Sequence, residues 1–225
     1  EKFPWLLGGS ADLAPSNMTN LNFEDAGDFG PDNYGGRNFH FGIREHSMAA
    51  ICNGMSLSGL RSYCATFFVF TDYLRPALRL SSIMHQDVIY IMTHDSIGLG
   101  EDGPTHQPVS HLASCRAIPG VNVFRPADAN EVAQAYRTLA AAQSQPSMLV
   151  LPRQGLPTLC REEYGAASGT SQGAYVLKDS ADTPQVILMG TGSEVHICLD
   201  AQKQLAAEGI AARVVSMPCW ELFDA

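Results

Sequence analysis

The residues best suited to chemistry gather in residues 93–108, which include two histidines, three acidic residues and three glycines. The segment follows a continuous apolar run of strand length, and its glycines let a ligand approach the backbone closely. His94, Asp102 and His106 are therefore candidates for hydrogen bonding or proton transfer. From composition alone, an Asp- and Gly-rich surface turn is an equal alternative. Their spacing matches no zinc or EF-hand template, so no metal ligands are predicted.

Two more segments carry residue types that chemistry uses. Glu45 ends a glycine-rich stretch at the predicted start of a helix, where the helix dipole alone already favours a carboxylate. Phe67, Phe70 and Tyr73 follow a predicted strand, and aromatic residues in such places usually pack into the core. Taken singly, neither segment requires a function.

The elements that position these residues alternate between short β-rich runs and helical patterns, which is typical of an α/β fold. The predicted strands are 62–68, 87–93, 120–124 and 147–151, and the predicted helices are 44–57, 71–85 and a third that Asp128 or Asn130 caps and that ends near Gln143. Pro76 predicts that the second helix is kinked or begins late. We expect a parallel sheet with helices on both faces and with functional loops at the carboxyl ends of its strands.

The helical periodicity also predicts which side chains face the core. These are Met48, Ile51, Cys52 and Met55 in the first helix, Leu74, Leu78 and Ile83 in the second, and Val132, Ala135, Tyr136 and Leu139 in the third. Residues 1–43 show little periodicity and are expected to be loop with short embedded elements.

A composition rich in Gly, Ser and Pro from residue 154 to 184 marks a domain boundary. We expect one domain over 1–163, and over 164–225 a linker with the start of a second α/β domain, built from strand 185–189, helix 194–208 and strand 211–216. The turn before that helix, residues 190–194, has a setting that suits a phosphate, but it lacks the third glycine of a dinucleotide fingerprint, so a structural turn is favoured. Both ends of the sequence are expected to be cuts in a longer polypeptide.

Composition and charge narrow the class of protein. The chain of 225 residues is 45% hydrophobic and 16% charged, which excludes disordered, collagen-like and coiled-coil chains. Its net charge of −9 disfavours nucleic acids and anionic membranes as partners. The six cysteines form no C-x-x-C pair, which indicates buried thiols in a reducing compartment, the cytoplasm by default.

These segments resemble transketolase, a thiamine-diphosphate enzyme, in their order along the chain. The resemblance includes an upstream segment at 8–17, Gly-Gly-Ser-Ala-Asp-Leu-Ala-Pro-Ser-Asn. The resemblance covers nearly the whole chain, including Arg153-Gln154 and residues 190–195. It implies the pyrimidine-binding domain followed by the beginning of the C-terminal domain. The implied reaction moves a two-carbon ketol unit from a ketose phosphate to an aldose phosphate in the pentose phosphate pathway.

The resemblance also implies roles for residues around the cofactor. Glu45 matches the carboxyl group that exchanges a proton with N1′ of the aminopyrimidine. Because a helix N-terminus favours the ionised form, burial must keep the acid form accessible. Phe67, Phe70 and Tyr73 match the aminopyrimidine pocket, and Asp12 matches a residue near the cationic thiazolium.

Substrate positions follow from the same matching. His94, Asp102 and His106 would face the sugar, with His106 near the reacting carbonyl, whereas Ser16 and Arg153 would hold the substrate phosphate. A guanidinium suits this task because it offers paired donors to an anion.

The family anchors the diphosphate through a divalent metal, magnesium or calcium, bound by a Gly-Asp-Gly motif that this sequence lacks. In the family that motif lies in an N-terminal domain, and each active site is shared between the two subunits of a homodimer. We therefore expect this chain to carry half of a site and to be inactive alone.

Several alternatives stay open. Dihydroxyacetone synthase, 1-deoxyxylulose-phosphate synthase and the pyruvate dehydrogenase beta subunit are related thiamine enzymes. His94 with the complete loop at 98–108 argues against the last two and only weakly against the first. An inert dimerising or ligand-binding module is the alternative from another class.

Overall fold

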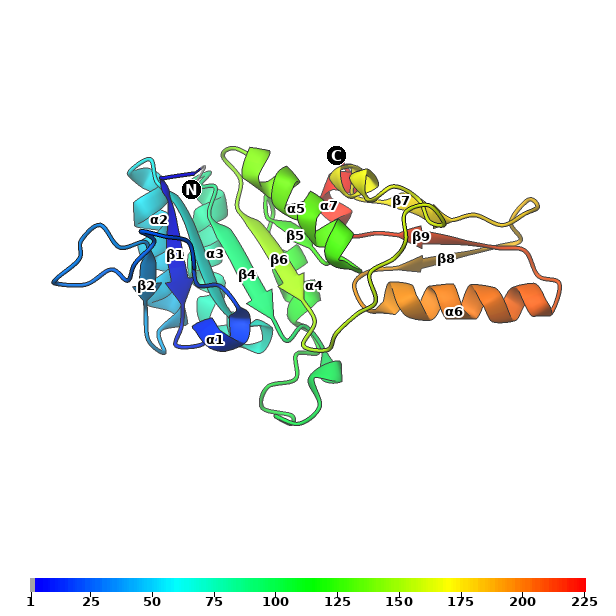
Figure 1. Cartoon of the computed structure of the whole chain (residues 1–225), viewed down its shortest axis with the longest axis horizontal. Coiled ribbons are helices and arrows are strands. Elements are labelled where there is room, and N and C mark those ends of the chain that lie inside the picture. The colour runs from blue at the N-terminus through cyan, green and yellow to red at the C-terminus, as the bar shows by residue number, and fades with distance from the viewer. Residues whose placement is uncertain (1–2) are drawn as a thin grey trace. The chain divides into compact units, whose positions relative to one another are not determined.

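The computed structural model describes residues 3–225 as an α/β chain with two sheets (Figure 1). It divides into two compact units. The first unit comprises the chain up to residue 121 together with 142–153, and the second comprises 122–141 and 154–225. Within the described residues, no helix is long and apolar enough to cross a membrane.

The larger sheet has the strand order β2-β1-β3-β4-β6-β5. Its strands are β1 (Leu6–Ser10), β2 (Asn38–His40), β3 (Arg61–Phe67), β4 (Ile89–Thr93), β5 (Asn122–Phe124) and β6 (Ser147–Leu151). The β1–β2, β1–β3, β3–β4 and β4–β6 pairs are all parallel, and helices flank the sheet (Figure 1). Every residue of β4 is buried, which explains its uninterrupted apolar sequence. The predicted parallel α/β fold is confirmed.

The first unit also contains the longer helices α2 (Glu45–Leu57) and α3 (Thr71–Ile83), which pack against each other. Its shorter helical elements are α1 (Ala14–Asn17), η1 (Phe68–Phe70), η2 (Ile97–Leu99) and α4 (His111–Arg116). Asn53 of α2 donates to the Ala77 carbonyl at 3.0 Å and accepts from the Ser81 hydroxyl at 2.5 Å. A buried amide between two helices is thereby satisfied on both of its polar atoms.

Some predictions about these helices are wrong. Helix α3 begins at Thr71 with Pro76 inside it, so it does not begin late, and the alternative of a kink at Pro76 stays a prediction. Ile51 and Ile83 were expected to face the core, but they are 47% and 55% exposed. In α2 the buried side is formed by Met48, Ala49, Cys52 and Asn53, so the apolar stripe is rotated away from Ile51.

Strand β1 lies inside the sheet although its sequence, Leu-Leu-Gly-Gly-Ser, gives little sign of a strand. The two glycines are explained by crowding from both neighbours. A Cβ on Gly8 would lie 1.9 Å from the Tyr63 carbonyl oxygen, and one on Gly9 would lie 1.8 Å from that of Phe39. Only glycine permits this close approach of three backbones.

The second unit contains helix α5 (Ala129–Ala141) and a three-stranded sheet of order β7-β9-β8. Its other elements are β5, whose bounds are given above, η3 (Ala167–Gln172), β7 (Tyr175–Lys178), β8 (Val186–Gly190), α6 (Glu194–Ala207), β9 (Ala212–Ser216) and α7 (Trp220–Phe223). Strands β8 and β9 are parallel and α6 connects them, which confirms the predicted β-α-β unit. Its core consists of Ala127, Leu159, Leu177, Val195, Leu199 and Val214.

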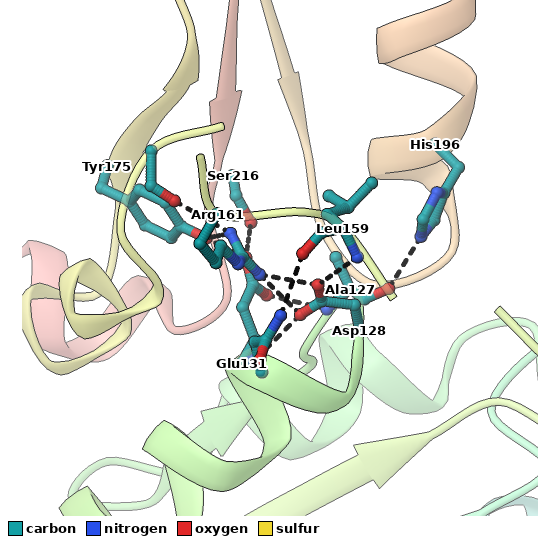
Figure 2. A network of polar contacts seen from close by, with 10 residues as sticks. Ala127, Asp128, Glu131, Leu159, Arg161, Tyr175, His196 and Ser216 are labelled. Carbon is teal, nitrogen blue, oxygen red and sulfur yellow. Dashed lines mark hydrogen bonds and ion pairs between the residues drawn. The ribbon is translucent and has the colours of Figure 1, made fainter. Parts of the chain in front are cut away.

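Helix α5 begins in a buried polar network (Figure 2). Asp128 caps the helix by accepting from the Glu131 backbone N–H at 2.9 Å, and it also accepts from Arg161 Nη2 at 2.7 Å on each carboxylate oxygen. Glu131 is fully buried and accepts from the Tyr175 and Ser216 hydroxyls, both at 2.6 Å. The predicted cap at Asp128 is confirmed. Tyr136 of the same helix was expected to be inward but is 39% exposed.

Candidate functional site

The candidate site lies where four adjacent parallel strands of the first unit end. Asp12 follows β1, Phe67 is the last residue of β3, His94 follows β4, and Arg153 lies two residues beyond β6. Phe67 is in register with Thr93, and Thr93 is in register with Leu151, so these ends are level across the sheet. The carboxyl ends of parallel strands are where α/β folds place their ligands.

Aromatic rings form one continuous cluster at this edge. The ring centroid of Phe67 lies 3.7 Å from that of His94, in a stacked arrangement, and 6.2 Å from that of Phe70. His106 contacts Phe70 edge-on at 5.5 Å, and Tyr73 lies 6.2 Å from Phe70. Two predicted groups, the aromatic trio and the two histidines, are therefore brought together.

Beside His94 lies a pocket of about 420 Å³ that opens to solvent. It is lined by Ser16, Asn17, Met18, Thr93, His94, Leu151, Pro152 and Arg153. Three of the predicted substrate-binding residues, Ser16, His94 and Arg153, share this pocket. Arg153 is half-exposed and its Nη2 lies 3.2 Å from a carboxylate oxygen of Glu101. An exposed ion pair of this kind contributes little stability, so the guanidinium can exchange Glu101 for another anion.

His94 has unusual backbone and side-chain surroundings. Its φ of +62° lies in the left-handed region, which is uncommon for a residue other than glycine. The residue is buried, and burial is the largest of the effects that lower the pKa of the imidazole. The positive charge of Arg153 lowers this pKa further, whereas the negative charges of Asp102 and Asp95 raise it. The side chain is therefore a neutral imidazole at pH 7.

Sequence reasoning missed the polar residues that hold His94. Thr93 Oγ1 lies 2.8 Å from His94 Nδ1 and accepts from Asn17 Nδ2 at 2.7 Å. The Asn17 carbonyl oxygen accepts from the Ser10 hydroxyl at 2.6 Å. All three partners lie in segments that the sequence had marked, but short polar residues carry no periodicity that would single them out.

The remaining predicted residues are placed as follows. Glu45 is the first residue of α2 and is buried at 7% exposure, although no hydrogen bond or ring contact within residues 3–225 joins it to the aromatic cluster. Asp12 is exposed, with a φ of +61°. Asp102 is exposed in the loop after β4 and acts on His94 through its charge.

The turn at 190–194 is filled by a side chain of the second unit. Arg125 is 3% exposed, donates to the Thr191 carbonyl at 2.9 Å and pairs with the Glu194 carboxylate. A Cβ on Gly192, whose φ is +58°, would lie 2.9 Å from three atoms of the Arg125 side chain. The helix N-terminus already faces a carboxylate there, which supports the structural turn over a phosphate site.

Comparison with known families gives two matches that together span most of the chain. The family described as "Transketolase, pyrimidine binding domain" matches residues 1–158. The family described as "Transketolase-like TK C-terminal domain" matches residues 173–225.

Individual relatives agree. The transketolase of Rhodobacter capsulatus is 56% identical over 223 residues, covering 99% of this chain and 33% of the relative, and the chloroplastic transketolase of Solanum tuberosum is 54% identical, covering 98% and 30%. A crystal structure of Pichia stipitis transketolase in complex with sedoheptulose-7-phosphate superimposes with a TM-score of 0.92 at 43% identity, covering 98% of this chain and 33% of that one. The chain thus spans about a third of the length of these relatives.

Proposed function

Because this chain belongs to the transketolase family, we propose that it supplies the aminopyrimidine and substrate side of an active site for ketol transfer. The complete enzyme that contains it would transfer a two-carbon ketol unit from a ketose phosphate to an aldose phosphate, as in the pentose phosphate pathway. One observation carries this proposal: the Phe67–His94 stack at 3.7 Å joins a set of flat aromatic surfaces to a pocket containing an arginine.

Thiamine diphosphate fits the residues present. Phe67 is buried, Phe70 is half-buried and Tyr73 is 63% exposed, so the cluster offers flat apolar surface that an aromatic ligand can cover. When bound, the cofactor supplies a carbanion at C2 of its thiazolium ring. Glu45 would hold the proton shared with N1′, and its burial lowers the local dielectric around that proton. Asp12 would lie toward the cationic ring.

We assign the substrate to the pocket beside His94. Arg153 would replace Glu101 with the substrate phosphate, and Ser16 would donate a hydroxyl hydrogen bond to the same group. His106 would lie near the reacting carbonyl and take part in its proton transfer, whereas His94 and Asp102 would bind sugar hydroxyls. These arginine and hydroxyl donors provide locally the positive potential that a chain of net charge −9 otherwise lacks.

The remaining parts of the site are proposed to come from elsewhere. No Gly-Asp-Gly motif occurs in the sequence, so the divalent metal, magnesium or calcium, would be bound outside it. We propose a homodimer whose active sites are shared between subunits. Supporting this, the two neighbouring helices α2 and α3 each expose large apolar side chains: Ile51 and Leu57 on α2, and Leu80 and Ile83 on α3. Nucleic acids and membranes are not proposed as partners.

We also propose the division of the chain at residue 163 and a cytoplasmic location. The two family matches end at 158 and begin at 173, which brackets the proposed boundary. All six cysteines are free thiols, and four of them are buried, which suits a reducing compartment.

The experiment that tests the function compares the complete enzyme with the chain of 225 residues. With thiamine diphosphate and magnesium, the complete enzyme should form a new aldose phosphate from xylulose 5-phosphate and ribose 5-phosphate. The chain alone should show neither turnover nor magnesium-dependent cofactor binding by calorimetry. Micromolar cofactor binding to the chain alone, or absence of transfer by the complete enzyme, would contradict the proposal.

A further inference from the structure

A row of four hydrogen-bonding residues ends at the buried ring of His94. Ser10 donates to Asn17 Oδ1 at 2.6 Å, Asn17 Nδ2 donates to Thr93 Oγ1 at 2.7 Å, and Thr93 Oγ1 lies 2.8 Å from His94 Nδ1. Ser10, Asn17, Thr93 and His94 are all buried. Residues on β1, α1 and β4 therefore combine to hold one imidazole.

The distances along this row favour one arrangement of its protons, in which the Ser10 hydroxyl makes its shorter contact with Asn17 at 2.6 Å and its longer one with the Ala65 carbonyl at 3.0 Å. The Ser10–Asn17 distance of 2.6 Å falls within the range of an O–H···O bond, about 2.5–3.0 Å, and below that of an N–H···O bond, about 2.7–3.2 Å. The carbonyl oxygen of Asn17 therefore faces Ser10, and its amide nitrogen faces Thr93. Thr93 Oγ1 accepts from Asn17, and its own hydrogen is available to donate to His94 Nδ1.

We propose that Thr93 and Asn17 are positioning residues that fix His94 as the neutral tautomer carrying its proton on Nε2. The row occupies Nδ1, and no hydrogen-bond partner of Nε2 occurs among residues 3–225, so its N–H remains for a ligand in the pocket. His94 thereby becomes a dedicated donor to a sugar or phosphate oxygen. The ligand class rests on the proposed function, whereas the tautomer does not.

The backbone and the ring contact support this assignment. A left-handed residue other than glycine is strained and persists where its surroundings over-determine it. Here two contacts fix the ring of His94: the Thr93 hydroxyl on its edge and the face of Phe67 at 3.7 Å. A ring held on both edge and face cannot turn to offer its other nitrogen.

Burial is the main cause that keeps His94 neutral. Arg153 and His106 disfavour the imidazolium, Asp95 and Asp102 favour it, and burial decides the balance by lowering the pKa. A protonated ring would carry hydrogens on both nitrogens and would lose the hydrogen bond that Thr93 donates. The row and the burial of the ring therefore favour the same state.

The test is a direct observation of the proton in the complete enzyme that contains this chain. Magic-angle-spinning 15N NMR of histidine-labelled protein distinguishes protonated from unprotonated ring nitrogens, and the signal lost in His94→Asn identifies the residue. We expect Nε2 to carry the proton in the parent enzyme and in Thr93→Ser. In Thr93→Val the preference for the tautomer protonated on Nε2 should be lost. In Asn17→Asp, which offers Thr93 an acceptor in place of a donor, the proton should move to Nδ1.

A control and a kinetic readout accompany the spectra. Thr66 is fully buried on β3 and its hydroxyl has no hydrogen-bond partner among the described residues, so Thr66→Val removes a hydroxyl that is not part of the row. For Thr93→Val we expect kcat/KM for ketol transfer to fall about tenfold, the size of one hydrogen bond, and for Thr93→Ser to restore it to within about twofold. In Asn17→Asp the low-pH limb of kcat/KM should move to higher pH, because a carboxylate stabilises the imidazolium.

A proton on Nδ1 in the parent enzyme, or identical spectra for Thr93→Val and Thr66→Val, overturns the positioning roles. Absence of ketol transfer with the predicted spectra intact refutes the proposed function and leaves the tautomer assignment confirmed.

Discussion

Replacing Arg161 with methionine in the second unit tests how far a buried charge network stabilises the fold. Arg161 donates to both oxygens of Asp128 at 2.7 Å, and to the Gly165 carbonyl and the Tyr175 hydroxyl at 3.0 Å (Figure 2). The Asp128 side chain has no exposed surface, whereas that of Arg161 is 20% exposed. Arg161→Met keeps most of the side-chain volume but leaves the Asp128 carboxylate without a counter-charge.

The expected loss of unfolding free energy follows from these values. Removing one partner of a buried ion pair costs about 3–5 kcal/mol because the remaining charge stays desolvated. The loss should lie near the lower end of this range, about 3 kcal/mol, for two reasons. The backbone N–H groups of Glu131 and Leu159 still donate to Asp128, and Arg161 is partly exposed. Asp128→Asn in the same background should recover part of this loss, since the buried group is then neutral.

Urea denaturation of the chain measures the effect. The sequence has two tryptophans, so a Trp5→Phe background leaves Trp220, in the second unit, as the only indole reporter. Arg213→Met is the matched control, because Arg213 pairs with both oxygens of Asp179 at 2.9 Å but on the surface. Surface pairs contribute little, so this variant should change the midpoint far less.

Two results would refute the reasoning. One is an equal loss for the buried and the exposed arginine variants, which would mean that burial does not set the strength of these pairs. The other is a double variant, Arg161→Met with Asp128→Asn, that is no more stable than Arg161→Met alone. That result would mean that lost packing, and not an uncompensated charge, causes the destabilisation.

Three further expectations concern single residues. In the complete enzyme, Glu45→Gln should retain cofactor affinity in calorimetry but lower kcat by about 10²–10⁴, the loss of an acid–base partner, and near-normal turnover would contradict the assignment. Because burial lowers the pKa of His94, the unfolded chain takes up that proton at a higher pH than the native chain does, so native stability decreases as the pH falls below 6.5. The urea midpoint of His94→Gln should therefore fall less with decreasing pH than that of the parent chain, and parallel curves would refute this. Gly192→Ala should lower the unfolding free energy, measured by urea denaturation, by about 2 kcal/mol or more, because Gly192 has a φ of +58° and its new Cβ would lie 2.9 Å from Arg125. Gly209→Ala is the control: Gly209 has a φ of +77° but open space around it, so the loss should be about 1 kcal/mol. Equal losses for the two variants would show that the Arg125 contact is unimportant.

The fold was largely predictable because its strands and helices have distinct periods. Strand β4 and helix α2 were both located to within two residues, since a buried parallel strand is apolar throughout and a helix repeats every three to four positions. Strand β1 was not predicted, because glycines that admit neighbouring backbones resemble the glycines of a loop. Ile51 was assigned to the core by the same periodicity, which gives the spacing of an apolar stripe but not how far it extends around the helix.

Prediction of the site was limited by a different factor. The histidines and aromatic residues were identified because their side chains are chemically distinctive, and the structure brings His94, His106 and Phe67 into contact. Asn17 and Thr93 were overlooked as functional residues, because a hydrogen bond between residues 76 positions apart has no trace in local sequence. The cofactor and substrate roles of all the predicted site residues, including these three, are still predictions.

The polar contacts of Glu131 have a consequence for how the chain is made on the ribosome. The carboxylate is synthesised with α5, but the Tyr175 and Ser216 hydroxyls that donate hydrogen bonds to it lie 44 and 85 positions later in the chain. At about 5–20 residues per second, translation delivers the last of them roughly 4–17 seconds after the helix itself. During that interval the nascent second unit must keep an acidic group hydrated that it later buries completely, so its assembly waits for β9 to be synthesised.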